Sequence, residues 1–152
     1  MKNVRTYIDT SVFGGVFDEE FESPSKTFFD QIKAGQFILV TSAVVQEEIN
    51  PAPQNVKDLF QEMLTHAEVV NISADALHLR NAYIDANIVS NKYSDDALHV
   101  ALATISRCPL IVSWNFRHIV HYEKIPLYNA VNVLLGYDQI SIYSPLEVIK
   151  YE

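Results

Sequence analysis

The chain has 152 residues, of which 49% are hydrophobic and 20% charged, and its formal net charge is −8 at pH 7. This length suits one domain over residues 1–152, and the apolar fraction excludes a disordered chain. The acidic balance argues mildly against nonspecific nucleic-acid binding, which depends on Lys and Arg neutralising phosphates.

The N-terminal part of the chain predicts a strand followed by a helix. The strand covers about residues 5–9, and Phe13–Gly15 then opens a loop rich in Asp and Glu. Ser23 is a suitable N-cap for the helix, Pro24 suits its first turn, and Gly35 lies just past its end.

A second strand and helix follow directly. Residues 37–41 form a short apolar run with β character. Ser42 then begins a helix that Pro51 ends. Together these segments predict one strand–helix–strand–helix passage, and residues 56–64 carry the spacing of a further helix.

The second half of the chain continues the alternation. Ser73 caps a helix that runs to about Ile88, and Ser94 caps the next one. Three further strands are predicted, at residues 68–72, 110–113 and 139–143. Several of the strands are apolar throughout, which is typical of a parallel sheet covered on both faces. The predicted fold is therefore α/β, with about five parallel strands and helices on both faces.

Asp9 ends the first predicted strand, so the strand places a carboxylate at the carboxyl edge of the sheet, where open α/β sheets bind ligands. Thr10 and Ser11 lie beside it as hydroxyl donors or acceptors. Taken alone, Asp9 is also a common turn-forming residue at a strand end.

Glu48 lies on the apolar side of the helix that starts at Ser42. With 100° per residue, it falls between Val44 and Val45, whereas Glu47 falls outside that arc. A carboxylate turned inward needs a metal ion, a cation or a shifted pKa.

Asp95 and Asp96 lie in the first turn of a helix, where the helix dipole favours negative charge. The rest of this helix is apolar on all sides, which indicates burial and directs at least one of the two carboxylates towards a cleft. We interpret His99 as a hydrogen-bonded helix residue, because no other His stands at metal-binding spacing.

Asn115 ends the fourth predicted strand, and its amide oxygen suits either metal coordination or the capping of a short helix over residues 116–120. Arg117 and His118 follow, and with His121 and Lys124 they form a local basic patch suited to a phosphate or to a solvated helix face. Oxygen donors at strand ends are what Mg²⁺ or Mn²⁺ selects.

These segments, in this order, resemble the PIN-domain family and most closely its VapC-like branch, the toxin ribonucleases of type II toxin–antitoxin systems. The likeness runs from Tyr7-Ile-Asp-Thr-Ser-Val12 to Ser113-Trp-Asn115. It implies that Asp9, Glu48 and Asp96 take the three acidic positions, with Asp96 preferred because it directly precedes Ala97-Leu98. The fourth position departs from the family, which often has Asp where this chain has Asn115.

The resemblance implies a metal-dependent endoribonuclease with Mg²⁺ or Mn²⁺ as cofactor, held by Asp9, Glu48, Asp96 and Asn115. We expect Ser11, beside Asp9, and Arg117 and His118, from the basic patch, to contact the RNA substrate. The resemblance further implies an antitoxin protein as partner and a homodimer. The charged N-terminus and the absence of a long apolar run lead us to expect a cytoplasmic protein without membrane attachment.

Three other interpretations stay open at this stage. The first is a catalytically weak or inactive PIN-like module that binds RNA or a protein partner, which Asn115 and the acidic charge favour. The second is a phosphatase with an aspartyl nucleophile, which requires a second Asp where this chain has Ser11. The third is an α/β domain whose acidic residues are all helix caps and solvated faces.

Overall fold

A five-stranded parallel sheet forms the centre of the protein. The computed structural model describes residues 3–151. The strand order is β3-β2-β1-β4-β5, and every pair is parallel. The strands are β1 (Val4–Ile8), β2 (Phe37–Ser42), β3 (Ala67–Val70), β4 (Leu110–Val112) and β5 (Ser141–Tyr143).

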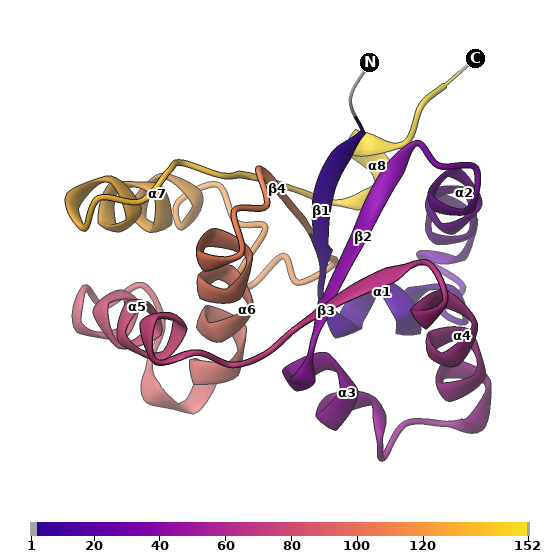
Figure 1. Ribbon diagram of the computed structural model, residues 1–152, viewed down its shortest axis with the longest axis horizontal. Coiled ribbons are helices and arrows are strands. Elements are labelled where there is room, and N and C mark those ends of the chain that lie inside the picture. Colours follow the sequence, from indigo (N-terminus) through magenta and orange to yellow (C-terminus); the bar gives the residue numbers. More distant parts are fainter. Residues whose placement is uncertain (1–2, 152) are drawn as a thin grey trace.

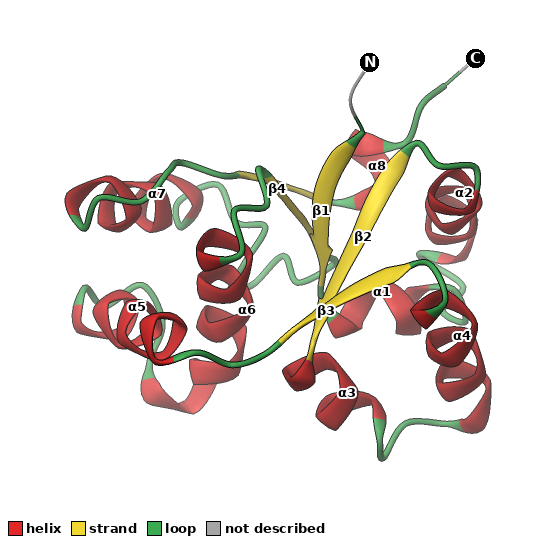
Figure 2. Cartoon of the chain, in the orientation of Figure 1, coloured by secondary structure: helices red, strands yellow, loops and turns green. Residues whose placement is uncertain are grey.

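Helices cover both faces of this sheet, as the sequence predicts (Figure 1). They are α1 (Thr10–Gly15), α2 (Glu22–Lys33), α3 (Ala43–Ile49), α4 (Gln54–Leu64), α5 (Ala74–Asp85), α6 (Ser94–Ile105), α7 (Ile125–Leu134) and α8 (Pro145–Val148), with a 3₁₀ turn, η1, over Asn91–Tyr93. Helices α2 and α4 lie on one side of the sheet, and α5, α6 and α7 lie on the other (Figure 2). Within residues 3–151 no helix has the length and hydropathy of a membrane span.

The register of the central strands brings their carboxyl ends to one edge. Ile8 of β1 pairs with Val112 of β4, so Asp9 and Ser113 leave the sheet side by side. The backbone N–H of Asp9 extends the ladder to the Val112 carbonyl. Tyr7 and Ile8 are fully buried. The core therefore fixes the backbone from which the site residues emerge.

Several predicted boundaries are correct. Ser42 and Ser73 cap α3 and α5, each accepting a hydrogen bond from a backbone N–H three residues on. Gly35 follows α2 with a positive φ of 81°, which a residue without Cβ adopts at little cost.

Other boundaries are wrong for identifiable reasons. Phe13–Gly15 belongs to α1, because burial of its apolar side anchors a helical turn despite two glycines, and the acidic loop follows it. Helix α2 begins at Glu22, so Ser23 lies inside it. Likewise η1 runs directly into α6, so Ser94 has helical backbone angles and does not cap it.

The C-terminal boundaries also differ. Helix α5 ends at Asp85, where Asn87 adopts a positive φ of 61°. Residues 116–120 form a turn in place of the expected short helix. Helix α7 has no counterpart in the sequence prediction.

Candidate active site at the carboxyl edge of the sheet

Asp9 is held in place by two serine hydroxyls. Its side chain is buried, with 4% exposure, and it follows β1 directly. Ser11 Oγ donates to Oδ1 at 2.6 Å, and Ser113 Oγ donates to Oδ2 at 2.7 Å. Ser11 Oγ also accepts the backbone N–H of Trp114 at 2.9 Å. This network ties the start of α1 to the end of β4 and fixes the orientation of the carboxylate.

Glu48 faces the site from α3, as its place on the apolar side of the helix predicts. Its side chain is 33% exposed, whereas Glu47 is on the solvent side. Oε1 accepts a hydrogen bond from Thr10 Oγ1 at 2.9 Å and contacts His99 Nε2 at 2.5 Å. Glu48 is therefore partnered by a hydroxyl at the start of α1 and by an imidazole on α6.

His99 is buried behind the carboxylates and is hydrogen-bonded on both sides of its ring. Nδ1 lies 2.8 Å from the Tyr7 hydroxyl, which in turn lies 2.8 Å from Ser42 Oγ. In its protonated form the ring donates from both nitrogens, to Tyr7 and to Glu48. The interpretation of His99 as a hydrogen-bonded helix residue is confirmed.

Asp96 faces the site from the first turn of α6, while Asp95 is exposed. Its Oδ2 lies 2.9 Å from Nδ1 of the nearly buried His118. Asn115 Oδ1 accepts the backbone N–H of His118 at 2.9 Å, so the amide of Asn115 caps the turn that positions this histidine.

The charges of three carboxylates raise the pKa of the His99 imidazole. Burial works to lower the pKa of His99, but its hydrogen bond to Glu48 and the charges of Asp9, Glu48 and Asp96 outweigh burial and raise the pKa. Burial also works to raise the pKa of Glu48, and the bond and charge of His99 overcome this effect and lower it. For Asp9, burial dominates and raises the pKa, against His99 and the two serines.

The chemistry of these donors fits a hard divalent cation, because the set consists of carboxylate and amide oxygens around a buried carboxylate whose charged form burial disfavours. The positions of these side chains do not form a complete metal site. Among residues 3–151, no three carboxylate, histidine or cysteine side chains form a group that holds a metal ion. Instead Glu48 and Asp96 are each held by a histidine. The four-residue metal site stays a prediction.

Several solved structures share this architecture. VapBC2 from Rickettsia felis, bound to promoter DNA, is 13% identical and superposes with a TM-score of 0.58 over 91% of this chain and 97% of its own. VapC20 from Mycobacterium tuberculosis, a sarcin–ricin loop cleaving toxin, is 12% identical with a TM-score of 0.57 over 89% and 98%. FitAcB from Neisseria gonorrhoeae is 10% identical with a TM-score of 0.58 over 94% and 99%.

The chain has a VapC-like PIN-domain fold. At these identities the likeness establishes the fold. No protein-family profile matches the sequence, and no curated protein matches it. The four positions that the PIN-domain resemblance singles out, Asp9, Glu48, Asp96 and Asn115, all lie at the carboxyl edge of the sheet or on helices that begin there.

The three residues predicted to contact substrate differ from one another in their burial and in their hydrogen-bond partners. Ser11 bonds to Asp9 and to the Trp114 backbone. His118 is nearly buried and bonded to Asp96, while Arg117 is exposed. Lys124, part of the same predicted basic patch, donates to the Ile88 carbonyl at 2.5 Å.

Two histidines of the candidate site, His99 and His118, are partners of the carboxylates that sequence reasoning missed. His99 stands three residues after Asp96 on one helix, but its own partners come from β1 and α3. No spacing in the sequence indicates those contacts. For His118, the pairing with Asp96 depends on the turn after β4, where a helix was expected.

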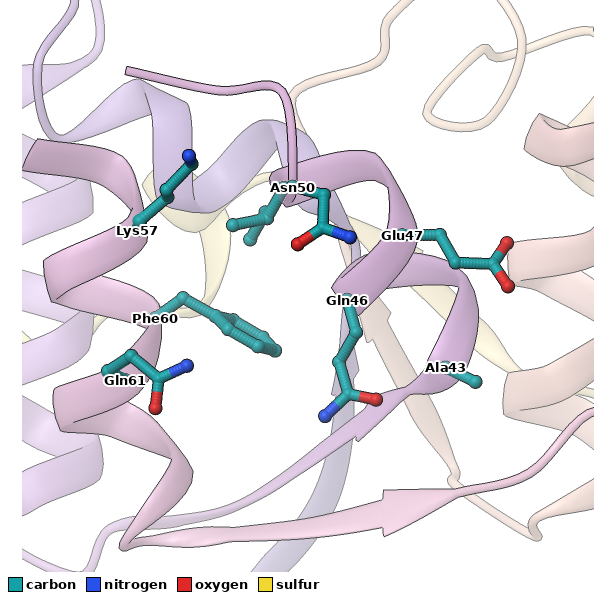
Figure 3. Close-up of a pocket in the computed structure, with 8 residues that line it drawn as sticks. Ala43, Gln46, Glu47, Asn50, Lys57, Phe60 and Gln61 are labelled. Carbon is teal, nitrogen blue, oxygen red and sulfur yellow. The ribbon is translucent and has the colours of Figure 1, made fainter. Parts of the chain in front are cut away.

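A separate cleft opens between α3 and α4 (Figure 3). Gln46, Asn50 and Gln61 surround it, with Phe60 and Lys57 on the α4 side. Glu48 does not line it and projects from another face of α3. The cleft is thus distinct from the carboxylate site.

Proposed function

We propose that the protein is a metal-dependent endoribonuclease that hydrolyses RNA phosphodiester bonds as the toxin of a type II toxin–antitoxin pair. The observation that supports this most is the place of the buried His99, which is bonded to Glu48 at the carboxyl edge of the sheet and whose pKa is raised by that bond and by the charges of Asp9 and Asp96. A fold shared with VapC toxins adds support. Both the site and the fold are consistent with catalysis by a metal ion bound to carboxylates.

Each residue has a distinct part in this proposal. Asp9 is the fixed ligand, oriented by Ser11 and Ser113. Glu48 and Asp96 would be the adjustable ligands, because in each carboxylate one oxygen contacts a histidine and the other has no hydrogen bond to the described residues. A bound Mg²⁺ or Mn²⁺ supplies charge neutralisation, polarisation of the phosphate and a water of lowered pKa.

Binding of the ion is testable without any substrate. Saturating Mg²⁺ or Mn²⁺ should raise the melting temperature, because a ligand at a hundred times its Kd stabilises the folded state by about 2.7 kcal/mol. Glu48→Gln should abolish much of this increase, whereas Glu47→Gln, one residue away on the solvent side, should retain it. Equal responses of the two variants would refute the assignment of Glu48.

A second function has one specific observation in its favour. Asn115 carries no charge, and its Oδ1 already caps the turn at His118. A catalytically weak or inactive module that binds RNA or a protein partner would need no complete acidic set. If the wild type is silent and Asn115→Asp gains activity, this alternative is favoured, whereas an active wild type removes it.

The proposed partners are an antitoxin protein and a second copy of the chain. The antitoxin proposal draws on neighbours that are toxin–antitoxin complexes. For the homodimer, α7 lies at the outer edge of the molecule (Figure 1). Its exposed apolar side chains are Leu127, Val133 and Leu134. A dimer would bury this face.

A further inference from the structure

The two sides of the candidate active site differ in charge. On the α2 side, Phe116 and Phe21 have ring centroids 6.2 Å apart, and Phe21 stacks on the indole of Trp114 at 4.2 Å. The segment around Phe21 carries four exposed carboxylates, of which Glu22 pairs with Lys26 and the other three, Asp18, Glu19 and Glu20, form no ion pair among the described residues. This side therefore disfavours a phosphate backbone.

The α6 side has the opposite character. Lys92 Nζ lies 5.6 Å and Arg117 Cζ 5.7 Å from the centroid of the Tyr93 ring. Tyr93 in turn packs against the His118 ring, with centroids 3.9 Å apart and the ring planes tilted by 33°, and His118 contacts Asp96. The ring thus connects two cations to a residue of the proposed catalytic set. We call Lys92, Tyr93 and Arg117 the cationic rim.

Neither cation of this rim is neutralised by the protein. Within residues 3–151, Lys92 and Arg117 form no ion pair with a carboxylate and no side-chain hydrogen bond. Two like charges near one ring repel each other, and a bound anion relieves that repulsion. In a chain with a net charge of −8, an unpaired pair of cations at the site is a specific feature.

We propose that the cationic rim binds the phosphate backbone of single-stranded RNA next to the carboxylate site. Lys92 and Arg117 contact phosphate, and Tyr93 is a positioning residue that holds both cations by cation–π attraction. This inference rests on the proposed ribonuclease function for its choice of RNA as the anion.

The charge distribution favours a single strand over a duplex. Helices α2 and α6 lie on opposite faces of the sheet (Figure 1), so a double helix docked across the site would place one backbone on the cationic rim and the other near the acidic loop at residues 18–22. A single strand would contact the cationic rim without a second backbone near the acidic loop.

The test measures RNA affinity independently of cleavage. Asp9→Asn, with its fold checked by circular dichroism, is mixed in EDTA with a fluorescein-labelled single-stranded RNA, and anisotropy is recorded from 25 to 200 mM salt. On this background Lys92→Ala and Arg117→Ala should each weaken binding roughly fivefold at low salt. Each should also lower the slope of log K against log salt by about 0.7.

Matched variants separate this effect from a loss of charge alone. Lys150→Ala removes a cation 5.9 Å from the Phe37 ring at the other end of the sheet, and Arg80→Ala removes an arginine from α5. Both should leave affinity and slope unchanged. Tyr93→Leu should weaken binding roughly threefold, and Tyr93→Phe should restore it, because only the ring is required.

The outcomes distinguish this inference from the proposed function. If wild-type protein leaves RNA intact but the rim variants lose affinity and slope as stated, the rim stands and the ribonuclease proposal fails. If RNA is cleaved and the rim variants bind like the Lys150 and Arg80 controls, the rim is refuted. Absence of RNA binding by the Asp9→Asn protein, or tighter binding of a duplex, also refutes it.

Discussion

Gly15 allows Trp114 to approach α1, and replacing it should disturb the candidate active site. A Cβ at Gly15 would lie 2.7 Å from both Trp114 Nε1 and Ser25 Oγ, closer than van der Waals contact permits. These two atoms form a hydrogen bond of 2.8 Å. The backbone N–H of Trp114 also donates to Ser11, which orients Asp9. The contact therefore links helix packing to the position of the carboxylate.

The expected destabilisation follows from three contributions. Overpacking costs about 1–3 kcal/mol, and loss of the Trp114–Ser25 hydrogen bond costs about 1 kcal/mol. Alanine regains up to about 1 kcal/mol as the better helix former. Gly15→Ala should thus destabilise the fold by about 1–4 kcal/mol, which lowers the melting temperature by roughly 2–16 °C.

Gly14 provides a matched control in the same helix. Nothing lies within 4 Å of a Cβ added there, so Gly14→Ala should be neutral or stabilise the protein by up to about 1 kcal/mol. Urea denaturation of both variants measures the difference directly. Equal stabilities for the two variants, or a more stable Gly15→Ala protein, would refute the packing described for Trp114.

Further predictions concern titration, thiol reactivity and assembly. In EDTA, the His99–Glu48 pair contributes fully between about pH 4.5 and 6.5, and its contribution is lost below this window through the lowered pKa of Glu48 and above it through the raised pKa of His99. His99→Gln should therefore cost more unfolding free energy in urea at pH 5.5 than at pH 9.5, and an equal cost would contradict the ion pair. Burial raises the pKa of Cys108 to about 11, so Ellman's reagent at pH 8 should react only after unfolding, and rapid native labelling would contradict this. Leu134→Glu on α7 should shift the protein to monomer in light scattering, whereas Leu146→Glu on α8 should not, and a dimeric Leu134→Glu protein would exclude this face.

The sequence was sufficient for the parallel α/β fold because the strands are short apolar runs and Ser42, Ser73 and Gly35 mark helix ends with ordinary capping chemistry. It was also sufficient for the inward orientation of Glu48, which depends only on helical periodicity. Both features are local, so a single chain carries enough information to predict them.

The parts that were missed depend on contacts between distant segments. Helix α1 forms despite Gly14 and Gly15 because Val12 and Phe13 are buried against the core. Helix α7 has a largely exposed apolar face, so its sequence lacks the usual helical periodicity of apolar and polar residues. His99 gains its partners from strands and helices 51 or more residues away.

The central claim is tested most directly by cleavage of a mixed pool of structured RNAs in EDTA, Mg²⁺ or Mn²⁺. Asp96→Asn and Asp95→Asn make a matched pair, because the two carboxylates are adjacent in α6 and only Asp96 faces the site. We predict metal-dependent cleavage by the wild type and by Asp95→Asn, with a loss of roughly a hundredfold or more in Asp96→Asn and in Asp9→Asn. Cleavage that persists in EDTA, or that survives in both Asp96→Asn and Asp9→Asn, would contradict the proposed site.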